Sequence, residues 1–81
     1  SGSTFKNPLE QSDKKVWQLI KESVSLEKSF GDASISDKHC NFFVNKGDVI
    51  FRDMKKLIVY VIESVLYIQR VKLETEIKIL E

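Results

Sequence analysis

Apolar residues recur at steps of three and four along residues 53–70, and this spacing constrains the fold more than any other feature. The repeating positions are Met54, Leu57, Ile58, Val61, Ile62 and Val65. Such spacing places side chains on one face of an α-helix, so it predicts a long helix over residues 53–70. Polar residues fall mostly on the other side, which predicts one exposed and one buried face. The buried face needs an apolar partner surface elsewhere in the chain.

A second, shorter apolar stripe predicts another helix over residues 13–23. Ser12 directly precedes this segment and is a residue type that caps helix N-termini. We expect Val16, Trp17, Ile20 and Val24 to form the apolar face, with Leu19 at its margin.

Three short segments have the patterns of β-strands. Residues 32–35 alternate between polar and apolar, and residues 41–45 form an apolar run between turn signals. Residues 72–79 alternate cleanly: one side of the predicted strand carries Leu73, Thr75, Ile77 and Ile79, and the other carries the charged residues between them. Residues 25–32 are interpreted as a connection. Two helices and three strands predict an α+β fold, a two-layer sandwich with both helices on one face of a small mixed sheet.

Composition excludes several classes of function. The 81 residues suffice for one domain with a single modest core. The formal net charge is +1, with acids and bases interspersed, so no basic stripe for a nucleic acid is present. No apolar run approaches the length of a membrane span. The single cysteine, Cys40, leaves no internal disulfide, and we expect a cytoplasmic protein with no nucleic-acid or membrane partner.

Judged on chemistry alone, three polar clusters are candidate sites: Ser3 with Lys6 and Asn7, Lys38 with His39 and Asn41, and Glu74 with Glu76. Each cluster also has a structural interpretation. A lone histidine in a turn is more often a surface residue than a ligand. Alternating acids and bases on a strand usually form a solvated face, and asparagine before proline often sets a turn. The residues taken singly therefore leave the function open.

Four sequence blocks, taken in order, resemble a known family. They are residues 2–8 (GSTFKNP), 17–20 (WQLI), 35–42 (ISDKHCNF) and 73–78 (LETEIK). In this order and at these spacings they resemble the C-terminal third of UDP-N-acetylenolpyruvoylglucosamine reductase, the MurB family, over essentially the whole chain. The first block is the most specific of the four.

The resemblance implies that residues 1–81 are the C-terminal, substrate-binding domain of a longer flavoenzyme. Enzymes of this family use FAD and NADPH to reduce UDP-N-acetylglucosamine enolpyruvate during the synthesis of peptidoglycan precursors. Their two N-terminal domains hold the flavin, and the third closes over the UDP-sugar. The expected partners are thus that substrate and the N-terminal flavin-binding domains. The chain alone is expected to bind no cofactor and to be inactive.

Five residues receive site roles from this resemblance. Ser3 matches the proton donor of the family and Glu76 its second catalytic group. Asn7 matches a substrate-contacting position, His39 is expected to reach the uridine diphosphate, and Lys6 either adds a point charge or lies beside the site. Hydride addition to the terminal alkene carbon leaves negative charge on its neighbour, a centre basic enough for a hydroxyl to protonate.

A function of a different class also remains open: a stand-alone α+β interaction module without catalytic activity. In that case the long helix or an uncovered sheet edge docks a partner or a second copy. The two hypotheses differ in geometry. An enzyme domain requires Ser3 and Glu76 to lie on one side of the fold, whereas an interaction module predicts exposed apolar surface on the long helix.

Overall fold

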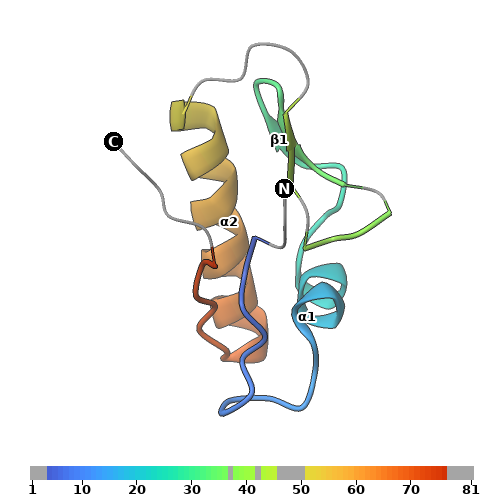
Figure 1. Ribbon diagram of the computed structural model, residues 1–81, viewed down its shortest axis with the longest axis vertical. Helices are drawn as coiled ribbons and strands as arrows, with labels where there is room; N and C mark the ends of the chain where they lie inside the picture. Colours follow the sequence, from blue (N-terminus) through green and yellow to red (C-terminus); the bar gives the residue numbers. More distant parts are fainter. Residues whose placement is uncertain (1–3, 37, 42, 46–50, 77–81) are drawn as a thin grey trace.

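The computed structural model describes residues 4–36, 38–41, 43–45 and 51–76. Within them lie two helices and a small antiparallel sheet (Figure 1). The predicted α+β fold is confirmed. The two described strand pairs are both antiparallel, whereas a mixed sheet was expected.

Helix α2 (Phe51–Gln69) is the long helix that the apolar spacing predicts. Its predicted stripe faces the core: Leu57, Ile58, Val61 and Val65 are buried, and Met54 and Ile62 are partly buried against them. The helix contacts the sheet along its N-terminal half and α1 along its C-terminal half (Figure 1). No helix of the described residues is both long and apolar enough to cross a bilayer.

Helix α1 (Val16–Ser23) begins later than predicted, and Ser12 does not cap it. The backbone N–H of Val16 donates instead to Oδ1 of Asn7 at 3.0 Å. At the preceding residue, the N–H of Lys15 donates to Oε1 of Gln18 at 3.0 Å. The free N–H groups at this helix end are thus partly satisfied by a side chain from outside the helix.

The buried face of α1 also differs from the prediction at two positions. Val16, Leu19 and Ile20 are almost completely buried, whereas Trp17 is 47% exposed. Leu19 therefore belongs to the core and Trp17 to the margin. Positions three and four apart share a helix face, and the contact with α2 selects the face that holds Leu19.

The sheet has the order β1 (Ser29–Phe30), β2 (Ala33–Ile35) and β3 (Phe43–Asn45). Strands β2 and β3 lie within the predicted segments, but β1 lies in the stretch interpreted as a connection. Phe30 pairs with Ala33, so Gly31 and Asp32 form a two-residue hairpin loop. Gly31 has a φ of 57° while Asp32 has a negative φ, the pattern of a type II′ turn with glycine first.

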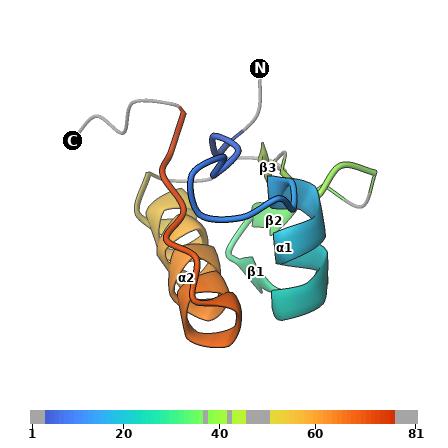
Figure 2. The same ribbon diagram turned by 90° about the horizontal axis from the view of Figure 1, so that it is seen from below.

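The C-terminal segment, residues 70–76, returns along α2 without forming a regular strand (Figure 2). Its side chains do alternate between buried and exposed: Val71 and Leu73 are buried, whereas Lys72 and Glu74 are exposed. Its backbone makes one isolated β-bridge, between Phe5 and Thr75. The strand predicted over 72–79 is therefore wrong for residues 72–76, and residues 77–79 lie outside the described residues.

Candidate functional site

The two ends of the described chain meet in the fold. The backbone N–H of Glu76 donates to the carbonyl of Thr4 at 2.8 Å, and the N–H of Lys6 donates to the carbonyl of Glu74 at 2.9 Å. The bridge between Phe5 and Thr75 lies between these two hydrogen bonds. Residues 4–6 and 74–76 therefore run side by side (Figure 2). Ser3 itself lies outside the described residues and directly precedes Thr4.

Asn41 holds the other edge of the N-terminal segment. The N–H of Thr4 donates to the Asn41 carbonyl at 2.7 Å. The N–H of Phe5 donates to Oδ1 of Asn41 at 2.9 Å, and Nδ2 of Asn41 donates to the Phe5 carbonyl at 3.0 Å. Phe5 is 1% exposed, and its ring meets that of Phe43 edge to face. The segment is thus anchored in the core as well as at both edges.

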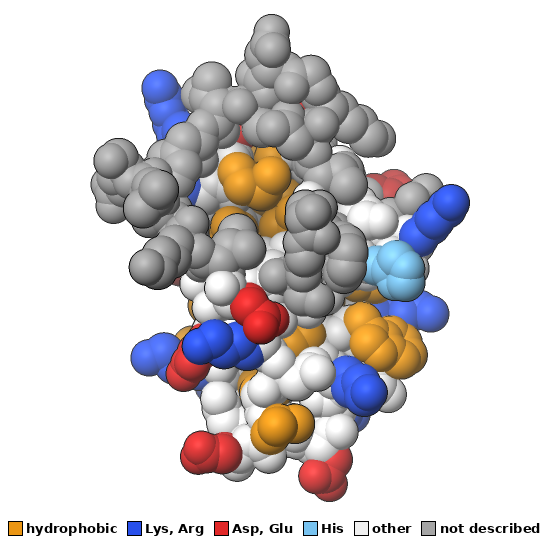
Figure 3. Space-filling model, in the orientation of Figure 1, with side chains coloured by type: hydrophobic (Ala, Val, Ile, Leu, Met, Phe, Trp, Pro, Cys, Tyr) orange, Lys and Arg blue, Asp and Glu red, His pale blue; other side chains and the backbone are white. Residues whose placement is uncertain are grey.

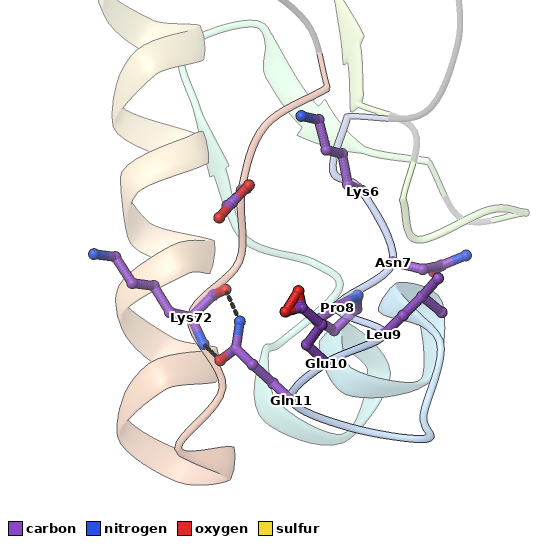
Figure 4. Close-up of a pocket in the computed structure, with 8 residues that line it drawn as sticks. Lys6, Asn7, Pro8, Leu9, Glu10, Gln11 and Lys72 are labelled. Carbon is purple, nitrogen blue, oxygen red and sulfur yellow. Dashed lines mark hydrogen bonds between the residues drawn. The ribbon is translucent and has the colours of Figure 1, made fainter.

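A pocket of about 420 Å³ opens between the N-terminal and C-terminal segments (Figure 4). It is lined by residues 6–11 together with Lys72 and Glu74. Gln11 ties the two walls together: its Oε1 accepts from the N–H of Lys72 at 2.8 Å, and its Nε2 donates to the Lys72 carbonyl at 2.9 Å. Cations and carboxylates are both present in the lining, so the pocket is polar and open to water.

Lys6 and Asn7 both line this pocket, but their side chains lie on opposite sides of the segment (Figure 4). The Lys6 side chain extends toward the C-terminal segment. The Asn7 carboxamide lies on the side away from it, where its oxygen accepts the hydrogen bond from Val16. Within the described residues no hydrogen bond involves Nδ2 of Asn7, so this group is available to a ligand.

His39 does not line the pocket. It is exposed on the loop between β2 and β3, and its backbone N–H donates to Oγ of Ser36 at 3.3 Å. This loop also carries Asn41, so it flanks the N-terminal segment on the edge opposite the pocket. Figure 3 shows the one histidine, in pale blue, at the margin of a face on which acidic and basic side chains are interspersed.

Two residues that hold the site together received no site role from the sequence. Gln11 was not singled out at all, since nothing in its neighbourhood marks a contact with a residue 61 positions away. Asn41 was noted in a polar cluster, but its pairing with Phe5 was not foreseen. Cys40, between Asn41 and His39, is buried with a free thiol, as expected of a small apolar residue. In the described part of the chain, no three His, Cys, Asp or Glu residues gather to hold a metal ion.

These features define a small α+β domain in which paired terminal segments border a polar pocket. The family model of the UDP-N-acetylenolpyruvoylglucosamine reductase C-terminal domain matches residues 1–80. The chain therefore belongs to this family, as the resemblance of the four blocks predicted.

Three curated relatives give the extent of the similarity. A UDP-N-acetylenolpyruvoylglucosamine reductase from Pelagibacter ubique (strain HTCC1062) is 64% identical over 81 residues, the whole of this chain. Proteins of the same name from Gluconobacter oxydans (strain 621H) and Rickettsia canadensis (strain McKiel) are 44% and 42% identical over 77 residues, 95% of this chain. The chain spans only 27%, 24% and 25% of the lengths of these three relatives.

Proposed function

We propose that residues 1–81 are the substrate-binding and proton-donating C-terminal domain of a longer UDP-N-acetylmuramate dehydrogenase. This enzyme reduces UDP-N-acetylglucosamine enolpyruvate in peptidoglycan precursor synthesis, with FAD and NADPH as cofactors. Besides family membership, one observation carries the proposal: the hydrogen bond between the Glu76 N–H and the Thr4 carbonyl. It unites the segment that follows Ser3 with the segment that carries Glu76, as one shared reacting carbon requires.

The pocket beside Lys6 is lined mainly by charged and polar side chains, which suit a sugar nucleotide. FAD and NADPH are assigned to the N-terminal domains, which hold the flavin in this family, so the hydride reaches the substrate from outside this domain. The contribution of this chain is to bind the UDP-sugar and to supply a proton.

The proton is the chemical contribution proposed for this domain. Hydride addition turns the terminal CH₂ of the enolpyruvyl group into a methyl group and leaves an enolate spread into the carboxylate. The Ser3 hydroxyl donates its proton to the carbon that bears the ether oxygen, and solvent then returns a proton to the serine oxygen. Glu76, as the second catalytic group of the family, is assigned to the stabilisation of this doubly negative intermediate.

Binding is assigned to Lys6, Asn7 and His39. The substrate carries a diphosphate and a carboxylate, and the exposed Lys6 ammonium is a mobile point charge suited to such a group. The Asn7 carboxamide has its oxygen committed to α1, so it contributes Nδ2 as a donor. His39 extends the binding surface to the loop on the other edge of the N-terminal segment.

Asn7→Asp separates the ligand role of this residue from its structural role. The carboxylate still accepts from Val16 and suits the positive end of α1, so the stability of the fold is retained. The same change removes the Nδ2 donor and places negative charge against the diphosphate. We expect this variant to bind UDP-N-acetylglucosamine at least tenfold more weakly than wild type in an NMR titration. Unchanged affinity would restrict Asn7 to capping α1.

The catalytic assignment needs the natural full-length protein that contains this chain. The measurement is oxidation of NADPH that depends on UDP-N-acetylglucosamine enolpyruvate. Ser3→Ala and Glu76→Gln are expected to lower kcat by about 10²- to 10⁴-fold, the usual contribution of a positioned proton donor. Ser12→Ala and Glu27→Gln are the matched controls and should leave kcat unchanged. Absence of substrate-dependent oxidation by the wild type would refute the proposed function.

One observation favours the interaction module as a second candidate. Large exposed apolar side chains lie on α2: Val59, Leu66 and Tyr67 on the face away from the core, and Ile68 at the C-terminal end of the buried stripe. A domain that forms a quarter of its relatives also needs a surface that meets the remaining domains, so the same residues suit either function. Light scattering of the natural full-length protein separates them: a docking surface for a second copy gives a dimer that Leu66→Glu dissociates, whereas a surface used between the domains of one chain gives a monomer with or without this change.

A further inference from the structure

We propose that Asn41 is a positioning residue for the proton-transfer site, an inference that rests on the proposed function. Asn41 lies 36 residues from Phe5 in the sequence, yet its carboxamide makes both hydrogen bonds that the Phe5 peptide groups offer on that edge. Its own carbonyl accepts a third hydrogen bond, from the N–H of Thr4. These contacts concern no group assigned to the substrate, so Asn41 acts through the segment that it holds.

The chemistry of the contact requires a carboxamide. One planar group presents an acceptor and a donor side by side, and it pairs with Phe5 as a residue of a neighbouring strand would. Aspartate keeps the acceptor for the Phe5 N–H but sets an oxygen against the Phe5 carbonyl. Leucine has nearly the same shape and offers neither partner, which leaves both backbone groups of the buried Phe5 unpaired.

The position of this pairing connects it to catalysis. Thr4 and Phe5 are fixed by Asn41 on one edge and by residues 74–76 on the other. Glu76 is therefore in register with the same segment, through the hydrogen bond that its N–H gives to Thr4. Ser3 is joined to this fixed segment by a single peptide bond, and each backbone residue has only two freely rotating dihedral angles, so few rotations separate Ser3 from Thr4. Loss of the Asn41 contacts therefore loosens the proton donor and the Glu76 backbone together.

The test uses the natural full-length protein with Asn41→Leu, Asn41→Asp and a control, Ser36→Ala. Ser36 lies in the same loop, and its Oγ accepts two local hydrogen bonds, from the N–H groups of Lys38 and His39. We expect Asn41→Leu to lower kcat up to about 100-fold, the loss that a displacement of about 1 Å produces in a positioned group. Asn41→Asp should be intermediate because it keeps one of the two side-chain hydrogen bonds. Ser36→Ala should retain the wild-type kcat.

Two further readouts distinguish positioning from a merely structural role. The KM for the enolpyruvyl substrate should stay within about threefold in Asn41→Leu, since binding groups are retained while the proton donor is displaced. The solvent deuterium isotope effect on kcat should rise above that of wild type, because proton transfer becomes slower. A variant that is merely less stable would lose active protein without changing the isotope effect.

The outcomes for the inference and for the proposed function are separable. If wild type turns over the substrate and a folded Asn41→Leu has the wild-type kcat and isotope effect, the positioning role is refuted. If Asn41→Leu fails to fold, Asn41→Asp decides by the same two measurements. If wild type shows no turnover, the proposed function fails, and the positioning role fails with it. Amide exchange in the 81-residue chain then still reports whether Asn41 holds Phe5: the Phe5 N–H should exchange at least tenfold faster in Asn41→Leu, which removes its acceptor, than in Ser36→Ala.

Discussion

Replacement of Phe5 by alanine tests whether the N-terminal segment belongs to the core. The side chain is 1% exposed, and its ring centroid lies 5.7 Å from that of Phe43 at an interplanar angle of 78°. Truncation of such a residue costs about 3–5 kcal/mol, of which the aromatic pair supplies about 0.5–1.5 kcal/mol. A chain of this length has a total free energy of unfolding of about 4–12 kcal/mol. Phe5→Ala should therefore remove roughly a quarter or more of the stability.

Urea unfolding of the 81-residue chain, followed by circular dichroism, measures this loss. Leu9→Ala is the matched control, because Leu9 lies in the same segment but is 83% exposed, and it should change stability by less than about 0.5 kcal/mol. If Phe5→Ala leaves no folded baseline, Phe5→Leu should still fold with a loss of about 1–2 kcal/mol. A Phe5→Ala chain that unfolds within about 1 kcal/mol of wild type would refute the reasoning. The segment would then be a detachable tail.

Three other predictions concern the backbone and the surface. Arg70, directly after α2, has a φ of 59°, so Arg70→Gly should raise the free energy of unfolding by about 0.5–1 kcal/mol while Arg70→Ala gains nothing. Gly31→Ala should lower it by about 1–2 kcal/mol, and less in an Asp53→Ala background, because a Cβ there meets the Asp53 carboxylate. The Lys14 ammonium, 2.6 Å from Glu22, holds the pKa of Glu22 below its ordinary value. The contribution of this ion pair to the free energy of unfolding is therefore present at neutral pH and lost as the pH falls through the folded-state pKa of Glu22. In an NMR titration, the pKa of Glu22 should be higher in Lys14→Met than in wild type.

Sequence periodicity predicted the elements that can be recognised without knowing which part of the chain packs against them. The apolar stripe of α2 is long enough to indicate a helix, whichever surface covers it. The alternation predicted from residue 72 onward likewise separated the buried Leu73 from the exposed Lys72 and Glu74. It did not predict a bridge in place of a strand, because the partner is the short N-terminal segment and not another long strand.

The errors at the other elements have local physical causes. The start of α1 was assigned to Ser12, a good local cap, whereas Asn7 supplies the cap from nine residues away from Val16. Strand β1 was missed although Gly31 and Asp32 are a recognised pair for a two-residue hairpin loop. Tertiary contact decided the first case, and unrecognised turn chemistry caused the second.

The order of the sequence blocks predicted the family, and through it the candidate residues, but not how the chain holds them. The contacts that build the site join Thr4 to Glu76, Phe5 to Asn41 and Gln11 to Lys72. Each pair is separated by dozens of residues, and no local pattern encodes such a contact. Sequence reasoning therefore located the chemistry, while the supporting hydrogen bonds required the fold.

The same long-range contacts couple the site to the stability of the whole domain. Closing loops of this length costs entropy that only the complete core offsets, so the paired terminal segments should separate whenever the domain unfolds. Most substitutions near the pocket will then change stability and ligand affinity together. Asn7 is an exception, because its oxygen caps α1 while Nδ2 remains available to a ligand. A change that alters only the second atom, as Asn7→Asp does, isolates recognition from folding.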